Sequence, residues 1–283
     1  MGGQSDHCNA RKTARQNLSD CIGHEIAAAP HRRWIAEPPG RAGFIANVGS
    51  EAKAAAKNVL AVSPHLDDAV FACGEIVATA DDATVVTVFA GRPAAGSEPT
   101  SWDSDAGFSM GDDVIGARRD EDRRALACLN ATPVWLDFCD DQYGASPSID
   151  AIAVALAPLV ARDNVHDVLL PLGLFHADHR RTHEAGLLLT ARFPDRRWIV
   201  YEDALYRRID GLRDAGIESL RRGGHSPRRI DFRTDRSAHE RKRAAIACYA
   251  SQLRALATRG RKGHDDALAT ERYWQIAVPS PRP

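Results

Sequence analysis

Short apolar runs rich in β-branched residues alternate with longer segments of helical periodicity through the middle of the chain. The apolar runs predict buried strands at residues 58–63, 84–89, 133–138, 167–170 and 197–201. The intervening segments predict helices at residues 68–80, 115–129, 149–161 and 179–192. Strands that alternate with helices of this length are typical of a parallel sheet, and right-handed crossovers place helices on both of its faces. The pattern therefore predicts an α/β fold of three layers, α/β/α, with a mostly parallel sheet.

The pattern is weaker toward both ends of the chain. Residues 1–57 show little apolar periodicity, and we expect a flexible or loosely packed leader there, followed by a domain at residues 58–283. An arginine-rich stretch at residues 207–243 is typical of a solvated face, and a final helix is expected at about residues 238–256. A polar loop at residues 94–113 is long enough to shape a binding site.

The composition narrows the class of protein. Hydrophobic residues make up 44% of the chain and the net charge is −1, so no global field attracts nucleic acid, and we expect no nucleic-acid partner. The longest apolar runs, such as residues 151–160, are too short to span a bilayer, and residues 1–27 do not form a secretory signal. These features predict a cytoplasmic protein without an integral membrane segment, and they leave its oligomeric state open.

Histidine and aspartate gather directly after two of the predicted strands. The clusters are His65, Asp67 and Asp68 after the first strand, and His176, Asp178 and His179 after the fourth. Ligands of open α/β sheets bind at the carboxyl ends of the strands, so both clusters are expected at one edge of the sheet. Side chains three residues apart at the start of a helix can face one point.

These residue types suit a catalytic zinc ion, which takes three protein ligands and keeps a position open for water. His65, Asp68 and His179 are the candidate ligands of one ion per chain, and other divalent ions suit the same set. Asp67 is then free to accept a proton from the metal-bound water. His183, one helical turn after His179, is an alternative third ligand. Either aspartate could instead cap the following helix.

The two clusters resemble the signatures of a known family. Ser63-Pro64-His65-Leu66-Asp67-Asp68-Ala69 resembles the (A/P)HPDD signature of the PIG-L (LmbE-like) deacetylases, and His176-Ala177-Asp178-His179 resembles their HPDH signature. The similarity covers about residues 58–201 and extends loosely to a K-x-x-A-x-x-x-Y-x-S-Q pattern at residues 242–252. It implies a Rossmann-like fold, a divalent metal that is usually zinc, and hydrolysis of an N-acetyl group, most often on a glucosamine-type sugar.

The resemblance also assigns roles to the residues of the two motifs. It implies the same three metal ligands and makes Asp67 the general base. His176, as an imidazolium, would stabilise the tetrahedral oxyanion, and Asp178 would orient His176.

Two further residues match family positions outside the motifs. Arg118 and Asp140 would contact sugar hydroxyls, although Arg118 and Glu121 can equally form a pair on the surface of a helix. The chain also departs from the family pattern, with Leu66 in place of the usual proline and Asn130 where a glycine usually ends the helix.

We therefore predict a zinc-dependent hydrolase that removes an N-acetyl or other N-acyl group from an amino sugar or glycoside by attack of a zinc-bound water. One alternative keeps the site and changes the substrate to another small amide, such as a thiol-sugar conjugate. Another is a nucleotide-binding module, which would need a glycine-rich turn after the first strand. This chain has Asp67 and Asp68 there, and their carboxylates would repel phosphate. A third is a silent scaffold, against which the complete set of catalytic residues argues.

Overall fold

The computed structural model describes residues 54–261 and 263–277. Most of the expected leader, residues 1–57, therefore lies outside the described residues. Its last residues are hydrogen-bonded to the domain, since Ala54 N donates to Asp231 O at 3.0 Å and Lys57 N donates to the Asp167 carboxylate at 3.2 Å.

Seven strands form one mixed sheet in the order β3-β2-β1-β4-β5-β7-β6. The strands from β1 to β5 run parallel, whereas β7 pairs antiparallel with both β5 and β6. Their bounds are β1 (Asn58–Ser63), β2 (Asp82–Thr87), β3 (Thr132–Trp135), β4 (Asp167–Pro171), β5 (Arg197–Tyr201), β6 (Ser226–Ile230) and β7 (Tyr273–Ala277). The mostly parallel sheet that the sequence predicts is confirmed, and β7, the strand that runs in the opposite direction, lies in the region of weak pattern.

The strand order reverses at the centre of the sheet. From β1 the chain moves outward to β2 and β3, and it then returns to the other side of β1 at β4. A crevice forms at such a switch point because the connections leave the two strands in opposite directions. Both His/Asp motifs directly follow the two strands at this point, which brings them to one crevice.

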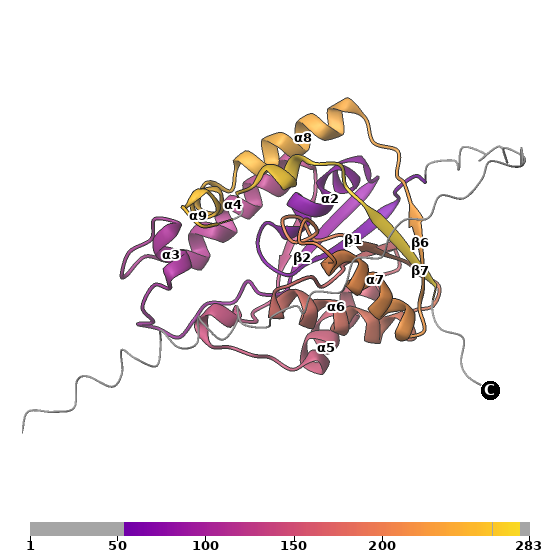
Figure 1. Ribbon diagram of the computed structural model, residues 1–283, viewed down its shortest axis with the longest axis horizontal. Helices are drawn as coiled ribbons and strands as arrows, with labels where there is room; N and C mark the ends of the chain where they lie inside the picture. Colours follow the sequence, from indigo (N-terminus) through magenta and orange to yellow (C-terminus); the bar gives the residue numbers. More distant parts are fainter. Residues whose placement is uncertain (1–53, 262, 278–283) are drawn as a thin grey trace, which may run out of the picture. The chain divides into compact units, whose positions relative to one another are not determined.

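Helices cover both faces of the sheet, with α2, α4, α8 and α9 on one side and α5, α6 and α7 on the other (Figure 1). The three-layer α/β/α architecture is therefore confirmed. The helices are α2 (Asp68–Thr79), α3 (Ser101–Asp105), α4 (Val114–Cys128), α5 (Ile149–Val160), α6 (Ala177–Thr190), α7 (Leu212–Arg222), α8 (Arg236–Ala247) and α9 (Ala250–Ala257), with 3-10 turns η1 (Asp141–Tyr143) and η2 (Asp265–Leu268).

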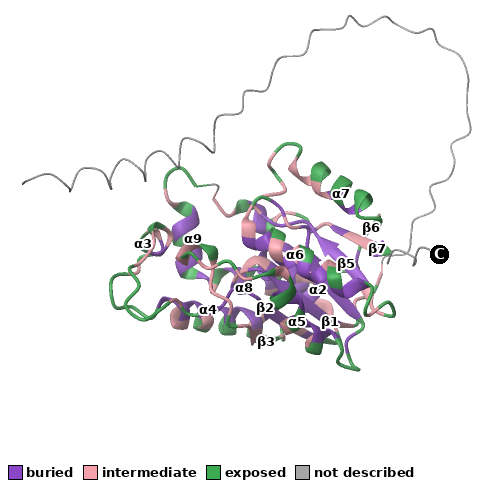
Figure 2. Cartoon of the chain, turned by 90° about the horizontal axis from the view of Figure 1, so that it is seen from below, coloured by how far each residue is buried: buried purple, intermediate pink, exposed green. Residues whose placement is uncertain are grey.

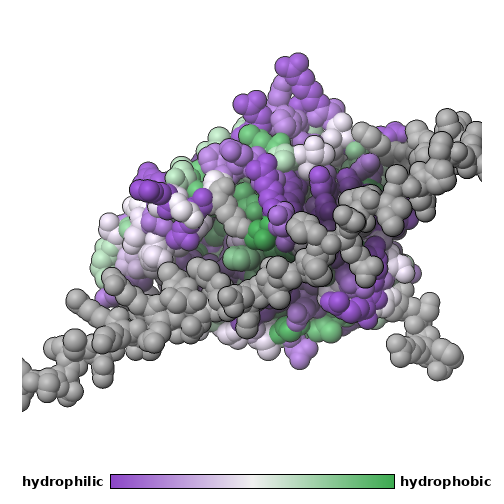
Figure 3. Space-filling view, in the orientation of Figure 1, coloured by the Kyte–Doolittle hydropathy of each residue, from purple (hydrophilic) through white to green (hydrophobic). Residues whose placement is uncertain are grey.

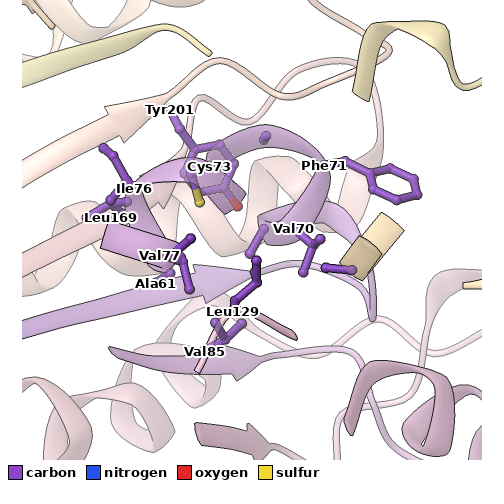
Figure 4. Close-up of a cluster of buried hydrophobic side chains, with 14 of the residues drawn as sticks. Ala61, Val70, Phe71, Cys73, Ile76, Val77, Val85, Leu129, Leu169 and Tyr201 are labelled. Atoms are coloured by element: carbon purple, nitrogen blue, oxygen red, sulfur yellow. The ribbon is translucent and has the colours of Figure 1, made fainter. Parts of the chain in front are cut away.

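The central strand contributes to two hydrophobic cores. Val59 and Ala61 of β1 face the core under α2, and Leu60 and Val62 face the core under α5 and α6. A strand buried on both faces reads as a continuous apolar run, which is why its pattern is unambiguous in the sequence. Figure 2 shows the buried sheet between helices with exposed outer faces, and Figure 4 shows the α2 side packed against the sheet residues.

The C-terminal part differs from the sequence prediction. The single helix expected at about residues 238–256 is two helices, because Tyr249 leaves the helical conformation (φ −87°, ψ 56°). Tyr249 is fully buried and donates a hydrogen bond to Asp122 at 2.7 Å. The stretch at residues 207–243 is not simply a solvated face, since it contains β6 and α7, and Ile217 and Leu220 of α7 are buried.

Two local features explain departures from regular patterns. The loop at residues 94–113 contains α3, which Thr100 caps by accepting a hydrogen bond from Asp103 N. Asn130 ends α4 in the left-handed conformation (φ 58°), which asparagine tolerates better than most residues, so it can stand in place of glycine.

The described part of the chain contains no helix that is both long enough and apolar enough to cross a membrane. Hydrophilic side chains cover much of the face shown in Figure 3, with apolar surface interspersed among them.

Candidate metal centre and active site

The turn between β1 and α2 brings a histidine and a carboxylate together. Ser63 Oγ donates to His65 O at 2.6 Å and accepts from Ala69 N at 2.9 Å, which ties the turn to the start of the helix. The Asp68 carboxylate accepts a hydrogen bond from His65 N at 2.9 Å, and the same oxygen, Oδ2, lies 3.1 Å from His65 Nδ1. One side chain thus orients the other.

His179, in the first turn of α6, reaches the same carboxylate from the other motif. Its Nε2 lies 3.1 Å from Asp68 Oδ2, and the side chain is only 1% exposed. This nitrogen is buried without a properly directed hydrogen bond. One ligand atom each of His65, Asp68 and His179 lies within 4.8 Å of the others, so the three predicted ligands converge on one point.

The far nitrogen of each imidazole faces a carboxylate. His65 Nε2 lies 3.2 Å from Asp178 Oδ2, and His179 Nδ1 lies 2.5 Å from Asp203 Oδ1. Metal-binding histidines usually have such a partner, which fixes the ring and directs the other nitrogen toward the ion. Together with the unsatisfied His179 Nε2, this arrangement fits a divalent cation.

Sequence reasoning missed Asp203, although a signal was present. Asp203 comes two residues after the last residue of β5, at the same edge of the sheet as both motifs. The rule that located the other site residues applies equally to this strand.

The acidic surroundings favour the protonated form of both ligand histidines. Burial lowers the pKa of His65, but Asp140, Asp178 and Asp68 outweigh it and hold that pKa well above its usual value. Burial opposes protonation of His179 too, yet Asp68 and Asp203 raise its pKa to about 9. A divalent ion at this place would neutralise the same carboxylate charge.

Asp67 occupies the N-cap position of α2 but does not act as a cap. Its side chain makes no capping hydrogen bond and instead lines the pocket beside His65. Burial, followed by the repulsion of Asp68, raises the pKa of Asp67 to about 8. A cation beside Asp67 would oppose this shift, because positive charge favours the carboxylate.

His176 caps α6, with Nδ1 accepting a hydrogen bond from Asp178 N at 3.2 Å. Burial and the neighbouring His65 and His179 lower the pKa of His176 to about 4. This lowered pKa disfavours the imidazolium that the family resemblance implies, and a neutral ring would carry its hydrogen on Nε2, because Nδ1 accepts the Asp178 N–H.

The carboxylate of Asp178 is engaged elsewhere. It lies 3.9 Å from His176 Nδ1, and it accepts hydrogen bonds from Asp141 N and Arg181 Nη1, each at 3.0 Å. Asp178 thus contacts His176 mainly through its backbone N–H, while its side chain supports His65.

Asp140 and Arg118, the candidate substrate-binding residues, both line the pocket. Asp140 caps η1, and its Oδ2 lies 3.7 Å from His65 Nε2. Arg118 is buried and its Nη2 lies 2.8 Å from Asp103 Oδ1. The alternative surface pair of Arg118 with Glu121 is wrong, because Glu121 is also buried and accepts hydrogen bonds from Ser251.

The comparisons with known proteins agree with this geometry. Residues 60–190 match the family model of PIG-L, GlcNAc-PI de-N-acetylase, and this stretch contains both motifs. The chain therefore carries a PIG-L family domain.

Two deacetylases are among the solved structures of similar fold. The A40926 pseudoaglycone deacetylase is 28% identical, with a TM-score of 0.64 over 80% of this chain and 99% of that chain. A triple mutant of a deacetylase of the teicoplanin biosynthetic pathway is 22% identical, with a TM-score of 0.67 over 80% of this chain and 100% of that one. No curated protein matches the chain.

Most of the predicted site residues line one pocket of about 330 Å³. The polar side of the pocket holds His65, Asp67, Asp68, Arg118, Asp140 and His176. Ser101 and Trp102 of α3 also line it, as expected for the loop at residues 94–113. The pocket has room for a small ligand, and His65 and Asp68 of the metal centre line it.

Among the described residues of the PIG-L domain, a second group can also hold a metal ion. It consists of His65, Asp140, His176 and Asp178, and so shares His65 with the first group. His183, the alternative third ligand, belongs to neither group. Its Nδ1 lies 2.8 Å from Pro171 O, and burial lowers its pKa.

Proposed function

We propose that this PIG-L domain is a zinc-dependent N-deacetylase that hydrolyses the N-acetyl group of an amino sugar within a glycoside. The observation that carries the proposal is the convergence of His65 Nδ1 and His179 Nε2 on the Asp68 carboxylate beside a pocket. The family match and the 28% identical pseudoaglycone deacetylase support the same chemistry. A nucleotide-binding role is disfavoured, since carboxylates line the crevice where phosphate would lie.

His65, Asp68 and His179 would hold the ion. When bound, a divalent ion supplies Lewis-acid chemistry, because it polarises a carbonyl and lowers the pKa of water to about 7. The remaining steps belong to side chains of the pocket. Asp67, a carboxylate with no capping role, accepts the proton of the attacking water and can then pass it to the departing amine.

His176 lines the same pocket as Asp67 and can act on the developing negative charge. Because its Nδ1 accepts the Asp178 N–H, the neutral ring carries its hydrogen on Nε2. That N–H can donate to the oxyanion as the amide carbon becomes tetrahedral, and removal of comparable donors costs about 10²–10³-fold in turnover. Asp140 and Arg118 would hold the hydroxyl groups of the sugar.

The test of the proposed function is Asp67→Asn, measured as acetate release from N-acetylated glucosamine derivatives by the zinc-loaded protein. The amide nearly matches the carboxylate in shape but cannot accept the proton, so we expect kcat to fall by about 10²–10⁴-fold. The KM and the metal content should stay near those of the parent, because the base acts mainly in the transition state.

Asp163→Asn, at an exposed carboxylate outside the pocket, is the matched control and should leave activity unchanged. Near-normal turnover of Asp67→Asn with metal bound would rule out this assignment of the base. A parent protein that binds zinc yet releases acetate from no amino sugar would refute the proposed function itself.

A further inference from the structure

Two bulky residues of the pocket have a backbone conformation that side chains rarely adopt. Phe175 has φ 63° and Leu205 has φ 70°, and both line the pocket next to Tyr206. The left-handed conformation is unfavourable for residues with a large side chain, and it persists mainly where the surrounding structure enforces it, often at ligand sites. The two residues follow different strands, so the same strain arises twice around one opening.

The surrounding contacts hold both backbones in place. Arg180 Nη1 donates to Phe175 O at 2.6 Å, and Leu205 N donates to the Asp266 carboxylate at 2.8 Å. Asp266 is itself buried and paired with Arg207. The fold therefore sets the backbone conformation of Phe175 and Leu205 before any ligand binds.

Aromatic rings connect Phe175 to the metal centre. The ring of Tyr206 packs edge-on against His179, with centroids 5.2 Å apart at 88°, and Phe175 stacks on Tyr206 at 5.3 Å and 21°. Phe175 is nevertheless 56% exposed, so the fold gains little from burying it. An exposed aromatic ring on a strained backbone, connected through Tyr206 to the metal ligand His179, indicates contact with a ligand.

The remainder of the pocket lining shows which part of a ligand would lie there. Trp102, Ile115 and Leu256 add apolar surface to the pocket, whereas its carboxylates and imidazoles gather at the metal centre. An amide bound at the metal centre would place the amino sugar among the polar groups. Phe175, two ring contacts away from His179, would then meet the group attached to that sugar.

We propose that Phe175, Leu205 and Tyr206, here called the apolar rim, bind an apolar or aromatic aglycone attached to the N-acetylated amino sugar. The substrates are then glycosides with such an aglycone rather than the free monosaccharide. This inference rests on the proposed deacetylase function and adds the class of substrate. Aromatic side chains supply large apolar contact area with defined stacking geometry, which suits a planar aglycone.

The experiment compares two substrates, N-acetylglucosamine and its phenyl glycoside, with the zinc-loaded protein. The decisive variant is Phe175→Asn, because asparagine tolerates the left-handed backbone and removes only the ring. We expect kcat/KM for the phenyl glycoside to fall about tenfold, mainly through KM, with little change for the free sugar. Phe175→Tyr keeps a ring and should behave as the parent protein.

Leu188→Ala is the matched control, since Leu188 is also an exposed large apolar residue but does not line the pocket. This variant should leave kcat/KM unchanged for both substrates. The inference is overturned if Phe175→Asn affects both substrates equally or affects neither.

Binding of the same two sugars, measured calorimetrically, separates the two proposals. Binding of the phenyl glycoside that depends on the Phe175 ring, without acetate release by the parent protein, would refute the deacetylase function and support the apolar rim. Acetate release by the parent protein that does not depend on the Phe175 ring would support the deacetylase function and refute the apolar rim.

Discussion

At the scale of single residues, the metal centre depends on groups outside the two motifs. The Asp203 carboxylate lies 2.5 Å from His179 Nδ1, and its other oxygen accepts a hydrogen bond from Leu174 N at 3.3 Å. Asp203 and His179 are each only 1% exposed. A buried carboxylate in this place fixes the imidazole so that Nε2 points toward Asp68.

Replacement of this carboxylate should weaken metal binding without removing a ligand. We expect Asp203→Asn to raise the zinc dissociation constant by about 10–100-fold, the usual effect of losing such a partner. Competition with a chromophoric chelator would measure the affinity directly. Asp210→Asn, at an exposed position of the following segment, is the control. An unchanged dissociation constant would mean that packing alone orients His179.

At the scale of elements, α2 contains a kink, and a buried ion pair is hydrogen-bonded to the backbone on both sides of it. Cys73 leaves the helical conformation (φ −141°, ψ 23°) in the middle of α2. On either side of Cys73, Glu75 N donates to Glu271 at 2.9 Å, and Phe71 O accepts from Lys242 Nζ, also at 2.9 Å. Lys242 and Glu271 are buried and 2.7 Å apart. The ion pair thus binds one backbone group on each side of the kink.

This arrangement constrains neighbouring residues and the site. A Cβ on Gly74 would lie 3.0 Å from Lys242 Cγ, so glycine allows the close approach of α8. The kink divides α2 and thereby sets the direction of its first turn, which carries Asp68. The ion pair therefore contributes to the position of a metal ligand from outside the pocket.

A double-mutant cycle in urea unfolding tests the ion pair. Lys242→Met leaves the Glu271 carboxylate buried without its cation, and we expect a loss of about 3–5 kcal/mol in the free energy of unfolding. Lys242→Met combined with Glu271→Gln should cost clearly less than the sum of the single changes.

The exposed pair of Arg236 and Glu240 on the same helix is the control for this cycle. Arg236→Met should cost less than about 1 kcal/mol. Strict additivity of the Lys242 and Glu271 changes would show that the two side chains act independently.

At the scale of the whole molecule, the metal centre joins distant parts of the chain. His65 and Asp68 follow β1, His179 follows β4, and Asp203 follows β5. A bound ion should therefore stabilise the entire domain, by about 2.7 kcal/mol when free metal is present at 100 times its dissociation constant. The midpoint temperature should fall when a chelator removes the ion.

The size of this stabilisation should depend on pH. Because the folded-state pKa of His179 is raised to about 9, its protonated form stabilises the metal-free protein below about pH 6.5, and this contribution is lost as the pH rises toward 9. Zinc must displace that proton, so its affinity increases over the same range. Thermal unfolding should show a larger zinc-induced shift at pH 8 than at pH 6. Equal shifts at both values would mean that His179 is not a ligand.

The sequence by itself determined the features that depend on local patterns. The central strands β1, β4 and β5 are continuous apolar runs because they are buried on both faces, and the two His/Asp motifs come after β1 and β4 in the sequence. Together these features predicted one crevice with His65, Asp67, Asp68, His176 and His179, and the structure brings these residues together there.

Only the tertiary structure decided the contacts between residues far apart in the chain. The break between α8 and α9 depends on the burial of Tyr249 against Asp122, 127 residues away, which local periodicity cannot reveal. The same holds for the pairing of Asp178 with His65 and for the Lys242–Glu271 ion pair. A buried polar side chain takes whichever partner the fold places beside it, because leaving it unpaired is costly, and that partner is fixed by packing rather than by spacing in the sequence.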